Sequence, residues 1–258
     1  MKQNLHAAFS FLTILCKGKD YTDSTMQKSV YYYPLVGAVI FFLSACVSLV
    51  SFKILDNYFF SALLFLLTDC LLTRGLHHDG LADIADAMGS GKTKEEFRAV
   101  LKDSRIGSFG VLALIFYFLF AAALLSQLLE INAKINNSYI FLIQMLFVGL
   151  WSRLGLLTLP LISEVYEPAA QKFSLAKILF AHFKKEYFLF WFTFLFIAST
   201  LCFNASLIIL CTSFSFLFTY PLYTITQKEK GYNGDFLGAN CLLWELAGYF
   251  SLVLFYQL

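Results

Sequence analysis

Seven apolar runs, each long enough to cross a lipid bilayer, constrain this chain more than any other feature. Spanning helices need roughly 17–25 mostly apolar residues, and runs of this kind fall near residues 32–51, 57–73, 109–129, 139–161, 187–203, 205–223 and 237–257. Only 14% of the residues are charged, against about 25% in soluble domains. We therefore predict an all-α polytopic integral membrane protein with about seven transmembrane helices (six to eight). Residues 1–258 are expected to form a single membrane-embedded domain.

Two shorter features refine this topology. The fifth and sixth runs are separated by little more than Asn204, which predicts a helical hairpin. Residues 5–16 are apolar but too short to span a bilayer. A signal-peptide core is the alternative, but KGKD follows this run and no small-x-small cleavage motif does. We expect a short interfacial or re-entrant helix at this position.

Lysine and arginine are concentrated in alternate loops. Sixteen of the nineteen lie in the N-terminal 31 residues and in the loops 74–108, 162–186 and 224–236. The intervening loops hold only Lys53 and Lys134, and Arg153 lies within the fourth span. Because basic residues are retained on the cytoplasmic side, we predict a cytoplasmic N-terminus, three cytoplasmic loops and a C-terminus on the outside.

The stretch GLHHDGLADIADAMGSG, directly after the second span, is unusually acidic. Asp79, Asp83 and Asp86 recur at i, i+4 and i+7, which places them within about 60° of one another on a helix. Carboxylates so close repel one another unless a cation lies between them, and Mg²⁺ takes carboxylate oxygens together with substrate phosphates. The alternative is a solvated acidic face paired with nearby Lys and Arg. Apolar residues such as Leu81 and Ile84 on the opposite face favour a packed helix with a free acidic stripe.

Two further polar clusters precede later spans. LKDSRIGSFG places Asp103, Arg105 and Gly107 before the third span, and arginine offers fork-like recognition of phosphate oxygens. KEKGYNGDFLGAN places Asn233 and Asp235 before the last span. An ordinary capping turn is the alternative for the first cluster, and a simple polar turn for the second.

Three charged residues lie inside the predicted spans. Asp69, Arg153 and Glu245 are costly in a bilayer, so each invites a functional hypothesis. Arg153 could pair with Asp69 or Glu245, or it could lie near the cytoplasmic end and contact an anionic substrate.

These motifs carry a family resemblance. TRGLHHDGLADIADAMGSG followed by KDSRIGSFG resembles the cobalamin (5′-phosphate) synthase family, also called the adenosylcobinamide-GDP ribazoletransferases. The likeness extends in order through YYYPLVGAVI, SRLGLLTLP and GYNGDFLGAN and covers most of the chain. One departure is Arg74, which stands where the family usually has glycine.

The resemblance implies an enzyme of cobalamin (vitamin B12) nucleotide loop assembly in the prokaryotic inner membrane. Such an enzyme transfers the adenosylcobinamide phosphate of adenosylcobinamide-GDP to α-ribazole or its 5′-phosphate, releases GMP and uses Mg²⁺. Expected partners are these small molecules and the lipid bilayer, with no nucleic acid; a homo-oligomer is left open.

The resemblance also implies roles for single residues. Asp79 and Asp83 are expected as metal ligands, Asp86 as a third ligand or as the base that orients the attacking hydroxyl, and His77 as a general base or as a group that orients a carboxylate. The remaining expected site residues are Asp103 as a catalytic group and, for substrate binding, Arg105, Gly107, Arg153, Asn233 and Asp235.

Two other functions remain as alternatives. The CDP-alcohol phosphotransferases have similar chemistry, but Gly75-x3-Asp79-x3-Asp83 matches only the tail of their motif. A cation-coupled transporter would explain charges inside the spans, but transporter sites usually lie at mid-membrane, often within inverted repeats, and the chain shows no internal repeat.

Overall fold

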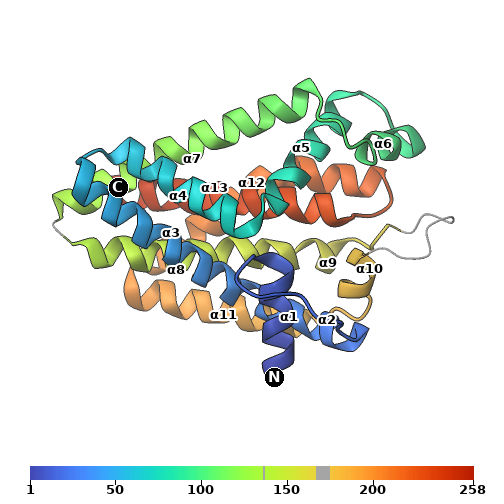
Figure 1. Cartoon of the computed structure of the whole chain (residues 1–258), viewed down its shortest axis with the longest axis horizontal. Helices are drawn as coiled ribbons and strands as arrows, with labels where there is room; N and C mark the ends of the chain where they lie inside the picture. Colours follow the sequence, from blue (N-terminus) through green and yellow to red (C-terminus); the bar gives the residue numbers. More distant parts are fainter. Residues whose placement is uncertain (136, 167–174) are drawn as a thin grey trace.

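The computed structural model describes residues 1–135, 137–166 and 175–258, and helices dominate this part of the chain (Figure 1). The long helices are α3 (Tyr33–Leu55), α4 (Tyr58–Thr73), α5 (Leu76–Gly89), α7 (Ser108–Lys134), α8 (Ser138–Leu154), α11 (Lys185–Cys202), α12 (Ala205–Lys228) and α13 (Gly234–Gln257). The short ones are α1 (Lys2–Leu12), α2 (Asp23–Ser29), η1 (Val30–Tyr32), α6 (Lys94–Leu101), η2 (Gly155–Leu157), α9 (Leu159–Ile162) and α10 (Leu175–Phe180). The described residues contain no named strand, only an isolated bridge between Val165 and Tyr232. The predicted all-α class is confirmed.

Six helical segments of the described chain are long and apolar enough to cross a membrane: α2 to α3 (Asp23–Leu55), α7, α8 to α9 (Ser138–Ile162), α11, α12 and α13. The pair α4 and α5 reaches that length only jointly and is bent by 93°. Six of the seven predicted runs coincide with these spans, and the run 57–73 coincides with α4, which does not qualify alone. A polytopic membrane protein is confirmed. The predicted hairpin is also present, because α11 ends at Cys202 and α12 begins at Ala205, with the Asn204 side chain accepting a hydrogen bond from the Ser206 N–H.

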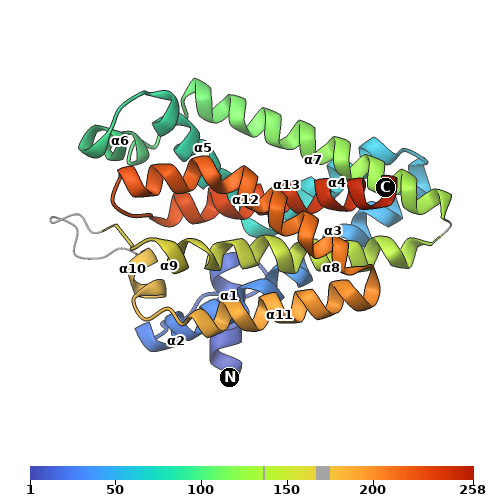
Figure 2. The ribbon, with the colours of Figure 1, turned by 180° about the vertical axis from the view of Figure 1, so that it is seen from behind.

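The spanning helices run roughly side by side along the long axis of the molecule (Figures 1 and 2). α13 is the most enclosed, because α5, α7, α8 and α12 all pack against it. Large apolar side chains on the outer helices are instead exposed, among them Phe116 and Phe120 on α7 and Phe216 on α12. Such faces suit contact with lipid tails, whereas α13 forms the protein-lined centre.

The N-terminal residues form a short helix, as predicted. α1 stands roughly across the direction of the long helices, near the start of α3 (Figure 1), and buries Ala7, Ala8 and Leu12. Its position at the membrane interface stays a prediction. The predicted loop 162–186 is described only at its two ends, and residues 167–174 lie outside the described part of the chain.

Two glycines set the distance between α3 and α8. A Cβ atom on Gly37 would collide with the carbonyl oxygen of Gly149, and a Cβ on Gly149 would collide with that of Gly37. Small residues allow helix backbones to approach closely, and in lipid this packing replaces the hydrophobic effect as a source of association.

Gly149→Ala should therefore force α3 and α8 apart. Overpacking of a tight contact costs about 1–3 kcal/mol, so we expect a lower Tm in detergent. Gly18→Ala is the matched control, because nothing lies within 4 Å of a Cβ at Gly18. Equal Tm values for the two variants would contradict this account of the α3–α8 contact.

Candidate active site

A sharp turn separates α4 from α5 and starts the candidate site. Arg74 and Gly75 both adopt the left-handed conformation, with φ of 56° and 66°. Their N–H groups bond back to carbonyls of the last turn of α4, that of Gly75 to Cys70 O at 2.9 Å. This is a left-handed helix C-terminus, and it turns the chain so that α5 runs at 93° to α4.

The acidic stretch forms one helix, as predicted. On α5, His77 and Ile84 are buried, whereas Asp79 is exposed and Asp83 and Asp86 are half-buried. The apolar face thus packs against the bundle and the three carboxylates share the opposite stripe, which confirms the predicted geometry of the helix.

Asp86 holds the start of α7. Its two carboxylate oxygens accept hydrogen bonds from the backbone N–H groups of Gly107 and Gly110, at 2.6 and 2.8 Å. A Cβ at either glycine would collide with the Asp86 carboxylate. A carboxylate at a helix N-terminus accepts hydrogen bonds from the helix's unpaired backbone N–H groups, and its negative charge interacts favourably with the helix dipole. Asp86 therefore fixes α7 to α5 through this contact.

The third polar cluster meets α5 at the start of α13. The Asn233 side chain accepts from the Phe236 N–H and donates to the Asp235 carboxylate at 2.7 Å. The backbone of Asp235 lies against Gly80, where a Cβ would be only 2.8 Å from the Asp235 carbonyl oxygen. Glycine at position 80 therefore allows residue 235 to lie beside the acidic stripe, although 155 residues separate them in the sequence.

Asp79, Asp83, Asp86 and Asp235 form what we call the acidic cluster. Asp83 feels the negative charges of the other three, an arrangement that a cation would stabilise. No group of three or more His, Cys, Asp or Glu residues within the described chain is arranged to hold a metal ion by itself. Mg²⁺ needs no such cage, because it commonly binds one or two carboxylates, waters and substrate phosphates. Asp79 and Asp83 fit that donor set, whereas both oxygens of Asp86 already bind α7.

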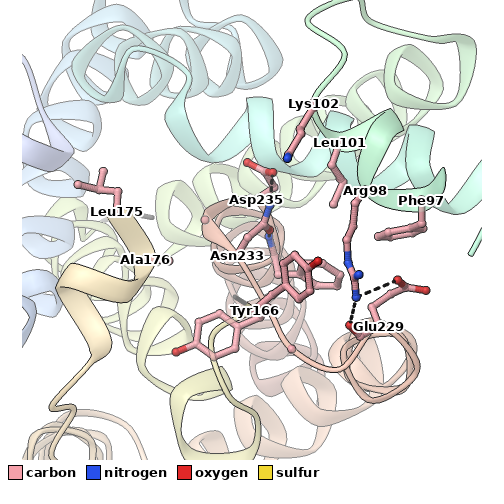
Figure 3. A pocket seen from close by; sticks show the side chains of 14 residues that line it. Phe97, Arg98, Leu101, Lys102, Tyr166, Leu175, Ala176, Glu229, Asn233 and Asp235 are labelled. Carbon is pink, nitrogen blue, oxygen red and sulfur yellow. Dashed lines mark hydrogen bonds and ion pairs between the residues drawn. The ribbon is translucent and has the colours of Figure 1, made fainter. Parts of the chain in front are cut away.

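A cavity of 290 Å³ opens beside the acidic cluster (Figure 3). We call it the Arg98 cavity; α6, α10, Tyr166 and the segment before α13 line it. The Arg98 guanidinium lies over the Tyr166 ring, 3.6 Å from its centroid, and its Nη2 is 3.8 Å from the Glu229 carboxylate. Lys102 is directed toward Asp235 in Figure 3. The cavity thus combines aromatic walls with two cations, a combination suited to a phosphorylated aromatic ligand.

A second cavity of 160 Å³ shares Leu175, Ala176, Gly234 and Asp235 with the lining of the Arg98 cavity. We call it the His77 cavity, because His77 lines it together with Asp79 and Asp235, and α1, α5, α10 and α13 bound it. A third opening of 450 Å³ is lined by Arg74, His78 and Asp79. Asp79 therefore borders the His77 cavity and the third opening, and Asp235 borders the Arg98 cavity and the His77 cavity.

The second motif forms an exposed ion pair. Arg105 donates to both oxygens of Asp103, at 2.9 and 2.6 Å. The bidentate pairing holds the pKa of Asp103 at about 2, so this carboxylate is ionised at neutral pH. Arg105 is largely exposed, and its predicted role at the diphosphate stays a prediction.

Arg153 lies in a fully buried cluster of charges. Its guanidinium donates to Asp69 at 3.0 Å and to Glu245 at 3.3 Å. The Tyr117 and Tyr249 hydroxyls donate to the same Glu245 carboxylate, at 2.7 and 3.1 Å. Of the two predicted possibilities for Arg153, pairing with Asp69 and Glu245 is the one observed. This buried triad joins α4, α8 and α13, and nothing in its geometry offers Arg153 to an anionic substrate.

Comparison with known proteins decides the family. The family model described as cobalamin-5-phosphate synthase matches residues 4–253. The chain belongs to the cobalamin-5-phosphate synthase family. It is 44% identical over 121 residues to a protein named adenosylcobinamide-GDP ribazoletransferase from Prosthecochloris aestuarii, covering 46% of this chain and 48% of that protein. A protein of the same name from Fusobacterium nucleatum is 40% identical over 46% of this chain and 45% of its own length.

A longer match comes from Clostridium tetani. Its protein, also named adenosylcobinamide-GDP ribazoletransferase, is 31% identical over 94% of this chain and 89% of its own length. The chain spans about half the length of the Prosthecochloris and Fusobacterium relatives in their matches. No solved structure matches this chain.

In this cobalamin-5-phosphate synthase family member, the three predicted polar clusters do not all meet. Asp79, Asp83 and Asp86 lie beside Asn233 and Asp235, and Gly107 joins them through Asp86. Asp103 and Arg105 pair with each other instead. The sequence analysis did not single out Arg98, Lys102, Tyr166 or Glu229. Lys102 and Glu229 lie within the quoted stretches LKDSRIGSFG and KEKGYNGDFLGAN, whereas Arg98 and Tyr166 lie outside every quoted motif.

Arg74, the departure from the resembled motif, adopts the left-handed conformation with φ of 56°. A non-glycine residue in this conformation destabilises the folded state by roughly 1–2 kcal/mol. Glycine removes that strain, but it loses about 0.5–1 kcal/mol more conformational entropy on folding. Arg74→Gly should therefore raise the Tm by roughly 1–4 °C. Lys53→Gly, in the helical last turn of α3, should instead lower stability by about 1 kcal/mol. A lower Tm for Arg74→Gly would mean that its side-chain contact with Phe11 O outweighs the strain.

Proposed function

We propose that this protein transfers the adenosylcobinamide phosphate of adenosylcobinamide-GDP to α-ribazole or its 5′-phosphate. A hydroxyl oxygen of the acceptor forms a bond to the phosphorus attached to adenosylcobinamide, while the bond from that phosphorus to the bridging oxygen of the diphosphate breaks. The hydroxyl proton passes to a base, GMP leaves with the bridging oxygen, and adenosylcobalamin or its 5′-phosphate forms. The relatives named above carry the corresponding name.

One observation carries this proposal: the acidic cluster is assembled from two distant family motifs. Asp79 and Asp83 come from α5 and Asp235 from the start of α13, in contact through Gly80. Their convergence places oxygen donors between cavities that are large enough for parts of two reactants.

Mg²⁺, when bound, would neutralise the negative charge that develops on the diphosphate and on departing GMP. Asp79 and Asp83 would hold it. Asp86 would keep α5 and α7 in register through Gly107 and Gly110. Lys102, which is directed toward Asp235, would meet phosphate oxygens at the edge of the Arg98 cavity. His77 borders the His77 cavity beside Asp79 and is the candidate for receiving the hydroxyl proton.

Sidedness supports the same assignment. The predicted cytoplasmic loops supply α5, α6 and the segment before α13, which line the acidic cluster and the Arg98 cavity. A nucleotide-activated substrate is cytoplasmic, so the active site should face the cytoplasm of a prokaryotic inner membrane.

The choice of nucleotide tests this function. Purified protein in nanodiscs would receive one of two mixtures, each with Mg²⁺. The first contains adenosylcobinamide-GDP and α-ribazole, and the second contains a CDP-activated lipid and an alcohol acceptor. We expect GMP release in the first mixture and no CMP release in the second. CMP release alone would support a lipid head-group transferase, and release of neither nucleotide by folded protein would contradict the transferase assignment.

A further inference from the structure

Cations are distributed unevenly among the spaces around the acidic cluster. Arg98 and Lys102 line the Arg98 cavity. Among the described residues that line the His77 cavity there is no lysine or arginine, and Asp79 and Asp235 are both present. Carboxylates repel a phosphate group and cations attract it. An anionic nucleotide therefore fits the Arg98 cavity better than the His77 cavity.

The two cations of the Arg98 cavity lie one helical turn apart. Arg98 belongs to α6 and Lys102 is the C-cap of that helix, and side chains at i and i+4 are neighbours on one helix face. In Figure 3, Lys102 is directed toward Asp235, whereas Arg98 pairs with Glu229 in another part of the cavity. The cavity thus offers one cation directed toward the acidic cluster and a second cation on the Glu229 side.

Arg98 and Tyr166 form a stacked pair in this cavity, with 3.6 Å between the guanidinium carbon and the ring centroid. The Tyr166 N–H donates to the Tyr232 carbonyl at 2.8 Å. Gly231 allows this approach, because a Cβ at that position would lie 2.8 Å from the Tyr166 nitrogen. The Arg98 side chain stays 20% exposed. A fixed pair of arginine and tyrosine offers flat surfaces on which a nucleobase can stack.

A second, basic opening adjoins the cavity at Arg98 and has a volume of 420 Å³. Its charged lining residues are Arg98, Lys94, Lys228, Lys230, Glu95 and Glu96. Four cations against two carboxylates give this opening a positive charge, which attracts anions. The opening therefore provides a route for an anionic nucleotide to and from the Arg98 cavity.

We propose that the Arg98 cavity binds the GMP half of adenosylcobinamide-GDP, with the Lys102 ammonium on the phosphate and the guanine stacked on the Arg98–Tyr166 pair. This inference rests on the proposed function, which makes GMP the leaving group. It puts the guanosine phosphate next to the acidic cluster, where the bond to the bridging oxygen breaks, and the base toward the basic opening. Lys102 and Tyr166 are then binding residues for the nucleotide and do not contact the acceptor.

Equilibrium binding to the intact protein in nanodiscs tests this assignment, with GMP and guanosine as the probes. Lys102→Met should weaken GMP binding by at least about tenfold, because a charge-assisted hydrogen bond is lost, and should leave guanosine binding within about twofold. Tyr166→Leu should weaken binding of both probes by about fivefold or more, because each loses a stacking surface. Lys92→Met and Tyr139→Leu are the matched controls, since both residues are exposed and neither lines the Arg98 cavity.

Steady-state kinetics separate the two reactants. Lys102→Met and Tyr166→Leu should raise the KM for adenosylcobinamide-GDP and leave the KM for α-ribazole within about twofold. A general distortion of the site would change both KM values. Lys102 is exposed, so Lys102→Met keeps the test valid if Tyr166→Leu does not fold.

Each outcome has a distinct meaning. Absence of GMP binding by wild type, or wild-type GMP affinity and KM values in both variants, would overturn the cavity assignment and leave the proposed function standing. Equal loss of GMP and guanosine binding in Lys102→Met would overturn the phosphate contact. Absence of GMP release from folded wild type would instead overturn the proposed function, whereas GMP binding that weakens only in the two cavity variants would still support the nucleotide site.

Discussion

Arg153→Met should lower the free energy of unfolding by about 3–5 kcal/mol, the usual cost of removing one partner from a buried ion pair. The substitution keeps much of the side-chain volume but leaves Asp69 and Glu245 buried without their cation. The Tyr117 and Tyr249 hydroxyls would still donate to Glu245, but hydrogen bonds alone cannot offset two desolvated carboxylates. Thermal unfolding of purified protein in detergent would measure the loss.

A triple variant separates charge from packing. Asp69→Asn, Arg153→Met and Glu245→Gln together remove every formal charge of the triad while keeping its shape. The triple variant leaves no unpaired charge in the bundle, and an unpaired buried charge is what makes the single variant costly. It should therefore regain most of the lost stability. If the single and triple variants unfold at the same temperature, the triad does not stabilise the packing of α4, α8 and α13 through its charges.

Asp83→Asn should reduce GMP release by at least about 100-fold, because metal stabilisation of transition-state charge amounts to several kcal/mol. The amide keeps the size of the side chain but removes the negative charge at the centre of the acidic cluster. Because Asp83 is half-buried and surrounded by like charges, its neutralisation should leave the Tm unchanged or slightly higher. Initial rates of GMP release at several Mg²⁺ concentrations would measure the effect.

Asp56→Asn is the matched control, since Asp56 is exposed in the short connection between α3 and α4. Its rate should equal that of wild type within about twofold. Asp86→Asn offers a further contrast: it should lower both the rate and the Tm, because Asp86 accepts hydrogen bonds from the start of α7. A wild-type rate for Asp83→Asn would remove Asp83 from the metal site.

Local periodicity explains what the sequence could predict. The apolar runs gave the spanning helices because a span must satisfy its own backbone hydrogen bonds in lipid. The spacing of Asp79, Asp83 and Asp86 predicted that they share one face of a helix, because an α-helix has about 3.6 residues per turn. The approach of Asp235 to Gly80 had no such local signal, since it depends on how α13 packs against α5.

The buried and loop residues were harder to predict for similar reasons. Sequence alone left Arg153 between an ion pair and a substrate contact, because its depth and its partners depend on the packing of three helices. Arg98 and Glu229 are 131 residues apart, and their contact arises only when α6 folds over the segment before α13. The hydrogen bonds from Gly107 and Gly110 to the Asp86 carboxylate were likewise unpredictable, because they depend on how close α7 lies to α5.

Direct detection of the joined product tests the central claim. Wild-type protein in nanodiscs would be incubated with adenosylcobinamide-GDP and α-ribazole, with Mg²⁺ or with EDTA, and the products would be identified by mass spectrometry. We predict adenosylcobalamin and GMP in equal amounts with Mg²⁺, and neither with EDTA. GMP without adenosylcobalamin would indicate hydrolysis, and the absence of both products from folded protein with Mg²⁺ would contradict the account.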